Sequence, residues 1–437
     1  MSAQTLPLVR CSQRNVGQVE TTASSSRIHF VPVLSVALIL RLVMAIVTIS
    51  AHPGMWFYNQ SSELGCLAHS VLDGRGLASP FCGVTGPSAF LAPGYPLLVA
   101  FAFRLFGEYT NSATVMLVLC QLVFGVLFVF ALMALSRRIF GSQVANIAGA
   151  ICAISPAMIW LPVLFWETSF TILSLTGILA FALHCIDNPK PLNWLTIGLF
   201  CGLAMLVNPA ITFTLAAIVL WAAWQARSVP RFAPALALVT WLLVFSAWPI
   251  RNEIVFHKFI PLRTNLGYEL WQGNHTGSDG AFDPTLHLNI NRIERSRYAE
   301  IGELNYMREK SAIAMAAIKA DPARFVRLSL QRANRFWFGF PSEQNSALVI
   351  ANLSLTTIFG AAGLALLVYR KPSYALLLSA PFVLFPLPYY LTHADFRFRL
   401  VLDPLAIMLS VYAVQSLRTP RITPYKRVYL VLISSVR

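Results

Sequence analysis

Long apolar runs separated by short polar connections fill most of this 437-residue chain. A helix that crosses a bilayer needs about 20 mostly apolar residues, within a range of about 17–25. Ten runs approach or reach this length, at 29–50, 113–135, 143–163, 168–186, 192–207, 210–226, 232–249, 345–369, 373–391 and 399–417. The pattern therefore predicts an all-α polytopic membrane protein with about ten transmembrane helices.

A further apolar run, PGYPLLVAFAFRLFG at 93–107, is too short for a span. It contains two prolines and carries Arg104 near its end. A short amphipathic segment of this kind is typical of a helix that lies along the membrane surface. We therefore predict a juxtamembrane helix here, on the outer face.

Basic residues orient the predicted spans, because short cytoplasmic segments of membrane proteins carry an excess of Lys and Arg. With ten spans, one side of the membrane carries Arg10, Arg14, Arg27, Arg137, Arg138, Lys190, Arg227, Arg231, Arg370, Lys371, Arg418, Arg421, Lys426, Arg427 and Arg437. The short segments of the other side hold Arg75, Arg104, Arg397 and Arg399. Both termini are thus predicted to be cytoplasmic. If 93–107 also crossed, Arg137 and Arg138 would move to the outer side.

This threading divides the chain into five parts. They are a disordered cytoplasmic tail (1–28), a transmembrane module that includes an outer loop at 51–112 (29–249), an outer loop region (250–344), C-terminal transmembrane helices (345–417) and a basic cytoplasmic tail (418–437). The outer loop region is predicted to be mostly helical in its later half. One of its helices opens with Asp321 at an N-cap position and Pro322 at the first helical position.

Composition agrees with a membrane protein and argues against a soluble one. The chain is 57% hydrophobic and 12% charged, whereas soluble domains carry about twice that charge. The formal net charge of +15 would suggest nucleic-acid binding in a soluble domain, but in a membrane protein the positive charges bear on orientation, and no nucleic-acid partner is expected. No cleavage site follows the first apolar run, and no signal peptide is predicted.

Two isolated carboxylates near the outer face are candidates for catalysis. Glu63 precedes a helical pattern of apolar residues that ends at DGRG, which places it in the first turn of a surface helix. Glu167 lies in a very short outer turn, as the only charged residue between Arg138 and Asp187. An acid at that depth is a functional candidate. The alternative for both is that the carboxylate complements a helix dipole.

Arginines and aromatic residues supply the remaining candidates. Guanidinium groups suit phosphate, and they occur near outer span ends at Arg251, Arg263, Arg397 and Arg399. Snorkelling to lipid headgroups is the alternative for each of them. Most outer aromatic residues fit an interfacial belt, whereas Tyr268 and Trp271 lie in the polar stretch GYELWQGN, where stacking on a sugar is an option. The outer histidines, His257, His275, His287 and His393, have no metal-ligand spacing and favour ordinary hydrogen bonding.

Cysteine positions leave one question open. Cys66 and Cys82 share the first outer loop. A disulfide between them would close a loop of about 17 residues and contribute about 3 kcal/mol. Two unpaired thiols are the alternative. Four other cysteines, Cys120, Cys152, Cys185 and Cys201, lie inside apolar segments and are interpreted as packing residues.

The order of these features resembles the GT-C glycosyltransferases. The resemblance rests on the first-loop acid before ELGCLAHSVLDGRG, the following FLAPGYPLLVAFAFRLFG and the second acid in the next outer turn. It is nearest to bacterial members related to protein mannosyltransferases and to aminoarabinose transferases that act on lipid A. The segments RNEIVFHKFIPLRTNLGYELWQGN and YYLTHADFRFRLVLDP are similar to pieces of a bacterial subgroup. Some relatives carry a Lys before APGYP, where this chain has Ser88, Ala89, Phe90 and Leu91.

The resemblance implies a GT-C-type bundle, and a sugar moved by inverting single displacement from a polyprenyl-phosphate donor to a glycan, lipid or protein acceptor. It implies an active site on the outer, periplasmic face of a bacterial inner membrane. Glu63 and Glu167 match the catalytic positions. The expected substrate-binding residues are Arg75, Tyr95, Arg251, Arg263, Tyr268, Glu269, Arg397 and Arg399. No fixed cofactor is implied, and a divalent metal ion is compatible with the family. The alternatives are a transporter or flippase of lipid-linked saccharides and a non-catalytic protein that binds them.

Overall fold

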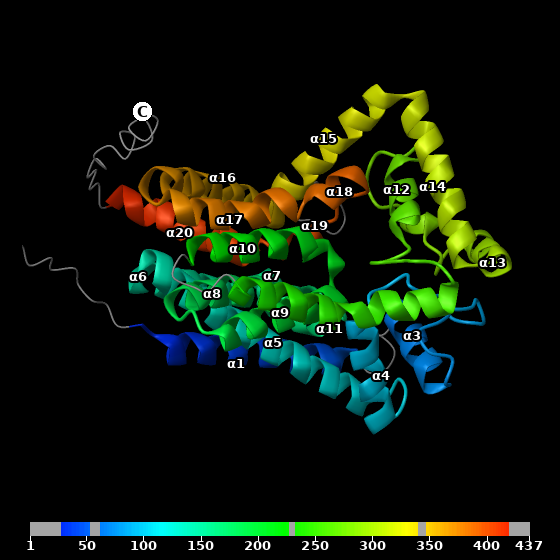
Figure 1. Cartoon of the computed structure of the whole chain (residues 1–437), viewed down its shortest axis with the longest axis horizontal. Helices are drawn as coiled ribbons and strands as arrows, with labels where there is room; N and C mark the ends of the chain where they lie inside the picture. Colours follow the sequence, from blue (N-terminus) through cyan, green and yellow to red (C-terminus); the bar gives the residue numbers. More distant parts are fainter. Residues whose placement is uncertain (1–27, 53–61, 227–231, 340–346, 419–437) are drawn as a thin grey trace, which may run out of the picture.

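The computed structural model describes residues 28–52, 62–226, 232–339 and 347–418, which form helices and contain no strand. Figure 1 shows long helices side by side along the longest axis, with helices α12 to α15 gathered at one end of this bundle. The two predicted cytoplasmic tails lie outside the described residues, except Ile28 of the first and Arg418 of the second. An all-helical chain is what a bilayer requires, since a helix satisfies its backbone polar groups internally. The predicted all-α class is confirmed.

Helices of the bundle follow the predicted spans closely. They are α1 (Phe30–Ala51), α5 (Asn111–Phe140), α6 (Ser142–Ile154), α7 (Pro156–Trp160), α8 (Thr168–Asp187), α9 (Pro191–Val207), α10 (Thr212–Gln225), α11 (Phe232–Phe256), α16 (Ala347–Arg370), α17 (Pro372–Leu384), α18 (Leu387–Leu391) and α20 (Asp403–Arg418). The remaining helices are α3 (Ser62–Leu72), α4 (Gly94–Phe106), α12 (Leu266–Asn274), α13 (Arg292–Ile301), α14 (Glu303–Ala320), α15 (Pro322–Phe338) and α19 (Phe396–Arg399).

Length and composition qualify six helices of the described chain as membrane spans, or seven when the pair Ser142–Ile154 and Pro156–Val163, bent by 58°, counts as one. Three further predicted spans are shorter apolar helices, at Pro191–Val207, Pro209–Gln225 and Asp403–Leu417. These run along the same axis as the long helices (Figure 1). The multi-pass architecture is therefore established, and the number of ten spans stays a prediction.

The short run at 93–107 forms the 13-residue helix α4, distinct from the long helix α5 that follows it. Such a helix spans about 20 Å at 1.5 Å per residue, which is less than a hydrocarbon core. With α3 it lies at the end of the bundle that carries α12 to α15 (Figure 1). Both positions agree with the predicted juxtamembrane helices.

The helix α11 runs past the expected end of its span. The transmembrane module was predicted to end at 249, but the helix continues through Pro249 to Phe256. This extension carries Arg251, whose Nη atoms donate to the carbonyl oxygens of Ser88 (2.9 Å) and Leu77 (2.6 Å). The extended end of α11 therefore holds the loop between α3 and α4 in place through these two hydrogen bonds.

The helix α15 is held to the segment after α12 through buried arginine side chains. Arg332 is fully buried and donates to carbonyl oxygens of Gly273, Gly280, Tyr390 and Leu391. Burial and the neighbouring arginines lower the pKa of Arg332 to about 10, so it is charged at neutral pH. Carbonyl groups of an irregular buried segment need such donors, because an unpaired one costs about 1–3 kcal/mol.

Basic residues occur at several helix ends on the side of the bundle away from α12 to α15. At the end away from α12 to α15, Arg138 pairs with Asp187 (2.6 Å), Lys371 donates to the carbonyl oxygen of Ile139, and Arg370 donates to Ser416. The first residues of α1 and the last of α20 lie at this same end (Figure 1). An excess of basic residues marks the cytoplasmic side, so we expect the α12–α15 end to face outward.

This orientation can be tested with single cysteines introduced at two exposed positions. Glu300 lies on α13, with its side chain 69% exposed, and Arg137 is exposed at the end of α5. In intact cells a membrane-impermeant maleimide should label Glu300→Cys, whereas Arg137→Cys should react only after permeabilisation. Labelling of both positions on the same side would contradict the predicted topology.

Candidate functional site

A single arginine at the outer end of the bundle lies in the field of four carboxylates. Arg397 belongs to α19, whose start is capped by the Asp395 side chain accepting from the Arg397 backbone N–H (3.0 Å). The guanidinium lies over the rings of Trp166 (5.4 Å to the centroid) and Phe398 (5.1 Å). Aromatic rings on this charge fix its position without consuming its hydrogen-bond donors.

Electrostatics identify the acids that surround Arg397. Burial alone would lower the pKa of this guanidinium, but Asp395, Glu167, Glu269 and Glu63 outweigh it and raise the pKa. Its side chain remains 35% exposed. No hydrogen bond from its Nη atoms to another described residue is present, and its Nε lies 3.8 Å from Asp395. The site therefore holds a partly exposed positive charge whose Nη donors are not engaged by a described protein partner.

Glu63 lies in the first turn of α3, as predicted, with its side chain 14% exposed. Its Oε1 accepts from Asn289 Nδ2 (2.9 Å) and lies 3.1 Å from His287 Nε2. Burial by itself would raise the pKa of Glu63, but the hydrogen bond and charge of His287, the residue's own backbone N–H and the charge of Arg397 together lower it. The carboxylate is thus ionised and fixed in place at neutral pH.

Glu269 has both of its oxygen atoms engaged. Oε1 accepts from Asn265 Nδ2 (2.6 Å), and Oε2 lies 2.8 Å from His393 Nε2. Burial opposes ionisation, but His393, Arg263 and Arg397 outweigh it and lower the pKa of Glu269. The backbones of the two segments that carry Glu269 and His393 approach each other closely at Gly273. A Cβ atom at this glycine would lie 1.7 Å from the Thr392 carbonyl oxygen, so a larger residue would separate the two segments.

Glu167 directly precedes α8, and its carboxylate makes fewer hydrogen bonds than those of Glu63 and Glu269. Its backbone carbonyl accepts from the Thr171 hydroxyl (2.9 Å), but within the described chain its carboxylate has no hydrogen bond or ion pair. Its charge acts on Arg397, Tyr95 and Tyr389. The structure therefore places both predicted catalytic acids in the electrostatic surroundings of one guanidinium.

Of the other predicted residues, Tyr95 and Arg263 border this cluster. Tyr95 is buried and its hydroxyl accepts from Gln121. Arg263 donates through Nε to the Phe90 carbonyl oxygen (2.8 Å), and its charge acts on Glu269. Both stay candidates for substrate contact.

Four predicted residues have their polar groups engaged elsewhere. Arg75 pairs with Asp73 (2.8 Å) in the first loop, and Arg251 is bonded to backbone carbonyls as described above. Arg399 is fully buried and paired with Asp403. Tyr268 is 1% exposed and accepts from Gln272 Nε2 (2.6 Å), inside the apolar core of the α12–α14 region. Their roles in substrate binding stay predictions.

Cys66 and Cys82 form a disulfide in the structure. It ties α3, which carries Glu63, to the loop that leads to α4. The four cysteines expected as packing residues are free thiols: Cys152, Cys185 and Cys201 are buried and Cys120 is half-buried.

Sequence reasoning treated His287 and His393 as ordinary hydrogen-bonding residues and missed that each one pairs with a site carboxylate. It also missed Asn289 and Phe282, whose ring lies between the two imidazoles, 5.8 Å from His287 and 5.2 Å from His393. No local signal marks the two histidines and Asn289, because the carboxylate that each one contacts lies more than 100 positions away in the chain.

The site can also be examined for metal ligands. Each imidazole nitrogen near an acid is already within hydrogen-bonding distance of that acid, at 3.1 Å for Glu63 and 2.8 Å for Glu269. Among the described residues, no three His, Cys, Asp or Glu side chains are grouped closely enough to hold an ion. The residues present therefore do not form a ready metal site, and we derive no step through a metal.

Comparisons with known proteins agree with this architecture. Residues 91–250 match the family model of dolichyl-phosphate-mannose-protein mannosyltransferases. The oligosaccharyltransferase of Archaeoglobus fulgidus in its apo form has 16% identity and a TM-score of 0.53, covering 88% of this chain and 50% of its own. The same archaeal enzyme, AglB, with an inhibitory peptide and a dolichol-phosphate has 14% identity and a TM-score of 0.51, with the same coverage.

A third structure, ArnT from Cupriavidus metallidurans bound to undecaprenyl phosphate, has 14% identity and a TM-score of 0.42, covering 87% of this chain and 77% of its own. No curated protein matches the sequence. The chain spans about half the length of the oligosaccharyltransferases it resembles.

The chain has the GT-C fold of the solved membrane glycosyltransferases that it resembles, and part of it, residues 91–250, matches the mannosyltransferase family model. The predicted resemblance is thereby confirmed. The particular segment that matches the mannosyltransferase model starts just before α4 and ends within α11, so it includes Glu167 and Tyr95.

The lowered pKa of Glu63 predicts a pH-dependent contribution to stability. A carboxyl group whose pKa is lower in the folded state stabilises that state above its ordinary value, here 4.5, and this stabilisation is lost as the pH falls through the folded pKa. Glu63→Gln should therefore lower Tm at pH 7, and the deficit should shrink below pH 4.5. The exposed Glu300→Gln serves as control. A deficit that is unchanged between pH 7 and pH 4 would argue against the assignment.

Proposed function

We propose that this protein is a membrane glycosyltransferase that moves a sugar from a polyprenyl-phosphate donor to an acceptor at the outer face of the membrane. The observation that carries the proposal is the placement of Arg397, with unengaged Nη donors, among Glu63, Glu167 and Glu269. A donor with an anionic phosphate and a polyol sugar matches this combination. The dolichol-phosphate in the AglB complex supports a lipid-phosphate donor.

The reaction would be a single displacement with inversion. The acceptor hydroxyl oxygen attacks the anomeric carbon and forms the new glycosidic bond, while the bond from that carbon to the phosphate oxygen breaks. The electron pair leaves with the lipid phosphate, and the acceptor proton passes to a carboxylate. The arginine fork at Arg397 would hold the departing phosphate, since guanidinium binds phosphate bidentately without losing its own proton.

Glu63 is our first choice for the carboxylate that receives the proton. His287 and Asn289 fix its Oε1, and its lowered pKa keeps it ionised. A weakly basic carboxylate accepts a proton late in the transition state, when the hydroxyl proton has become acidic, and general-base help of this kind contributes about 10²–10⁴-fold in rate. Glu167, whose carboxylate has no described partner, is the second choice.

Glu269 would orient hydroxyl groups of the sugar. Its two oxygens are held by Asn265 and His393, so they occupy defined positions beside Arg397. A rigid, hydrogen-bonded carboxylate is suited to positioning, because a bound group then needs no reorganisation at the moment of reaction. The orientation of the chain, with this site on the outer side of a bacterial inner membrane, is part of the same proposal.

Replacing Glu63 with Gln keeps the shape of the side chain and removes the proton acceptor. We expect turnover to fall by about two orders of magnitude or more, while affinity for the donor is largely retained. Transfer from a panel of polyprenyl-phosphate sugars by purified protein measures turnover, and Glu300→Gln is the matched control. Near-normal turnover in a folded Glu63→Gln variant would refute its role as base, and the same test would then move to Glu167.

Arg397→Lys keeps the positive charge but removes the planar fork. Charge-assisted hydrogen bonds contribute about 1.5–3 kcal/mol, so affinity for a polyprenyl phosphate should fall about 10- to 100-fold. Arg308→Lys, exposed on α14, is the control. Binding of undecaprenyl phosphate without a sugar reports the phosphate contact alone. Equal affinity in the two variants would remove Arg397 from donor binding.

A further inference from the structure

The helix α15 buries Leu328, Phe336 and one arginine, and it leaves branched apolar side chains exposed on its other side. On the side packed against the protein, Arg324 donates to carbonyl oxygens of Asn274, His275 and Ser278, and Arg332 is fully buried. On the opposite side, Val326 and Leu330 are 56% and 68% exposed. Branched apolar residues on the exposed side are unusual for a helix face that meets only water.

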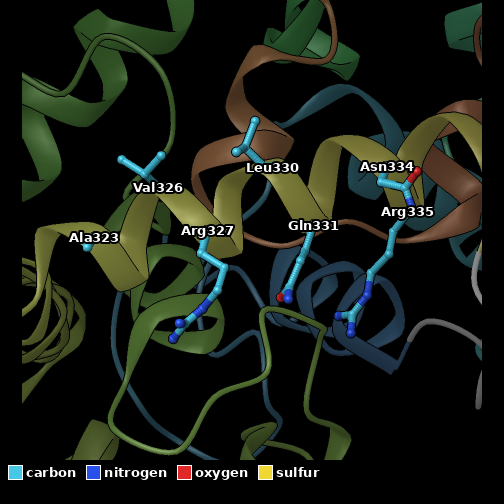
Figure 2. Close-up of a pocket in the computed structure, with 7 residues that line it drawn as sticks. All are labelled: Ala323, Val326, Arg327, Leu330, Gln331, Asn334 and Arg335. Carbon is cyan, nitrogen blue, oxygen red and sulfur yellow. The ribbon is translucent and has the colours of Figure 1, made fainter.

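The exposed face of α15 is also hollowed. A groove of about 650 Å³ is lined by Ala323, Val326, Arg327, Leu330, Gln331, Asn334 and Arg335. Figure 2 shows two edges: Ala323, Val326 and Leu330 lie along one, while the side chains of Arg327, Gln331 and Arg335 extend together along the other. Arg335 is paired with Asp279 (3.1 Å), whereas Arg327 forms no ion pair with a described residue and supplies the free charge of the groove.

The apolar edge continues onto the transmembrane bundle. Phe338, at the end of α15, is 38% exposed, and on α16 Leu348 and Leu355 are 81% and 56% exposed. The helix α16 is one of the six that are long and apolar enough to cross a membrane. In Figure 1, α15 rises obliquely from the bundle beside α16 towards α14. Its exposed apolar residues thus extend a surface that already faces lipid.

We infer that the outer face of α15 is seated in the outer leaflet of the bilayer, with Val326 and Leu330 among acyl chains and Arg327 on the phosphate of a phospholipid headgroup. Amphipathic helices bind the interface in this way, with the apolar edge a few ångströms below the phosphates. An arginine on such an edge extends its charge to the headgroup level. A water-soluble partner would not explain why the apolar edge runs into a lipid-facing helix.

Seating α15 in the leaflet has a structural consequence for the site. Its inner arginines bond the segment 273–280, which directly follows α12 with Glu269, and Arg332 also holds the carbonyl oxygens of Tyr390 and Leu391, just before His393. The helix therefore connects the bilayer to both members of the Glu269–His393 pair. Only this consequence depends on the proposed function; the membrane contact itself does not.

Spin labels can measure the depth of α15 independently of enzymatic activity. Val326→Cys and Leu330→Cys, in a background with the free cysteines replaced, would carry nitroxide labels in vesicles of phosphatidylethanolamine and phosphatidylglycerol. Ile293 on α13, 82% exposed, provides the control position. The labels at 326 and 330 should collide more with oxygen and less with a water-soluble nickel complex than the label at 293.

Two results would overturn the inference. Equal accessibility to the nickel complex at all three positions would place α15 in water. Strong dipolar broadening between labels on different molecules would indicate that a second copy covers the face. Neither result bears on glycosyl transfer, which the donor assay with Glu63→Gln tests separately.

Discussion

Arginine side chains bonded to backbone carbonyls are the interaction on which the outer part of this protein depends. The segments between α3 and α4 and after α12 are irregular, so their carbonyl groups lack the partners that a helix would supply. Arg251 and Arg332 satisfy several of them, and Arg263 bonds the carbonyl of Phe90. A bare carbonyl at these buried positions would be costly, and one guanidinium can serve several of them because it presents five donors. These contacts hold the outer helices on the bundle.

The same residue type has a different role at Arg397. Its guanidinium lies over two aromatic rings and feels the charge of nearby carboxylates, two of which are paired with histidines instead, so its Nη donors are not consumed by described protein groups. Arg399, two residues later, is instead buried and paired with Asp403. Two arginines of one short helix thus have different roles, one structural and one a candidate for ligand binding, according to which side of the helix meets the bundle.

The site lies where rigid and irregular elements meet. Glu167 directly precedes a bundle helix, whereas Glu63, Glu269 and Arg397 belong to short helices or loops of the outer end. The disulfide between Cys66 and Cys82 and the glycine contact at Gly273 restrict these irregular parts. Most of the site side chains thus come from outer segments rather than from bilayer-spanning helices. The disulfide and the hydrogen bonds fix these segments, and a preorganised site requires such fixed side chains.

The helical bundle could be predicted from the sequence because the bilayer imposes a local rule. Every run of about 20 apolar residues must satisfy its own backbone, and so each predicted span coincides with an apolar helix. The short run at 93–107 was recognised by the same rule. Glu63 and Glu167 could be singled out because an isolated charge beside an apolar segment is visible in the sequence itself.

The sequence did not reveal which side chains pair with the site carboxylates. Glu63 meets His287 and Asn289, and Glu269 meets His393, across separations of more than 100 residues. Likewise, nothing local distinguishes the arginines that bond carbonyls from Arg397, since the groups that each one contacts come from distant segments of the chain. Hydrophobic periodicity determines which segments are helices, because it acts between residues a few positions apart. Hydrogen bonds and ion pairs between distant segments depend on how the helices pack, and only the tertiary structure decides them.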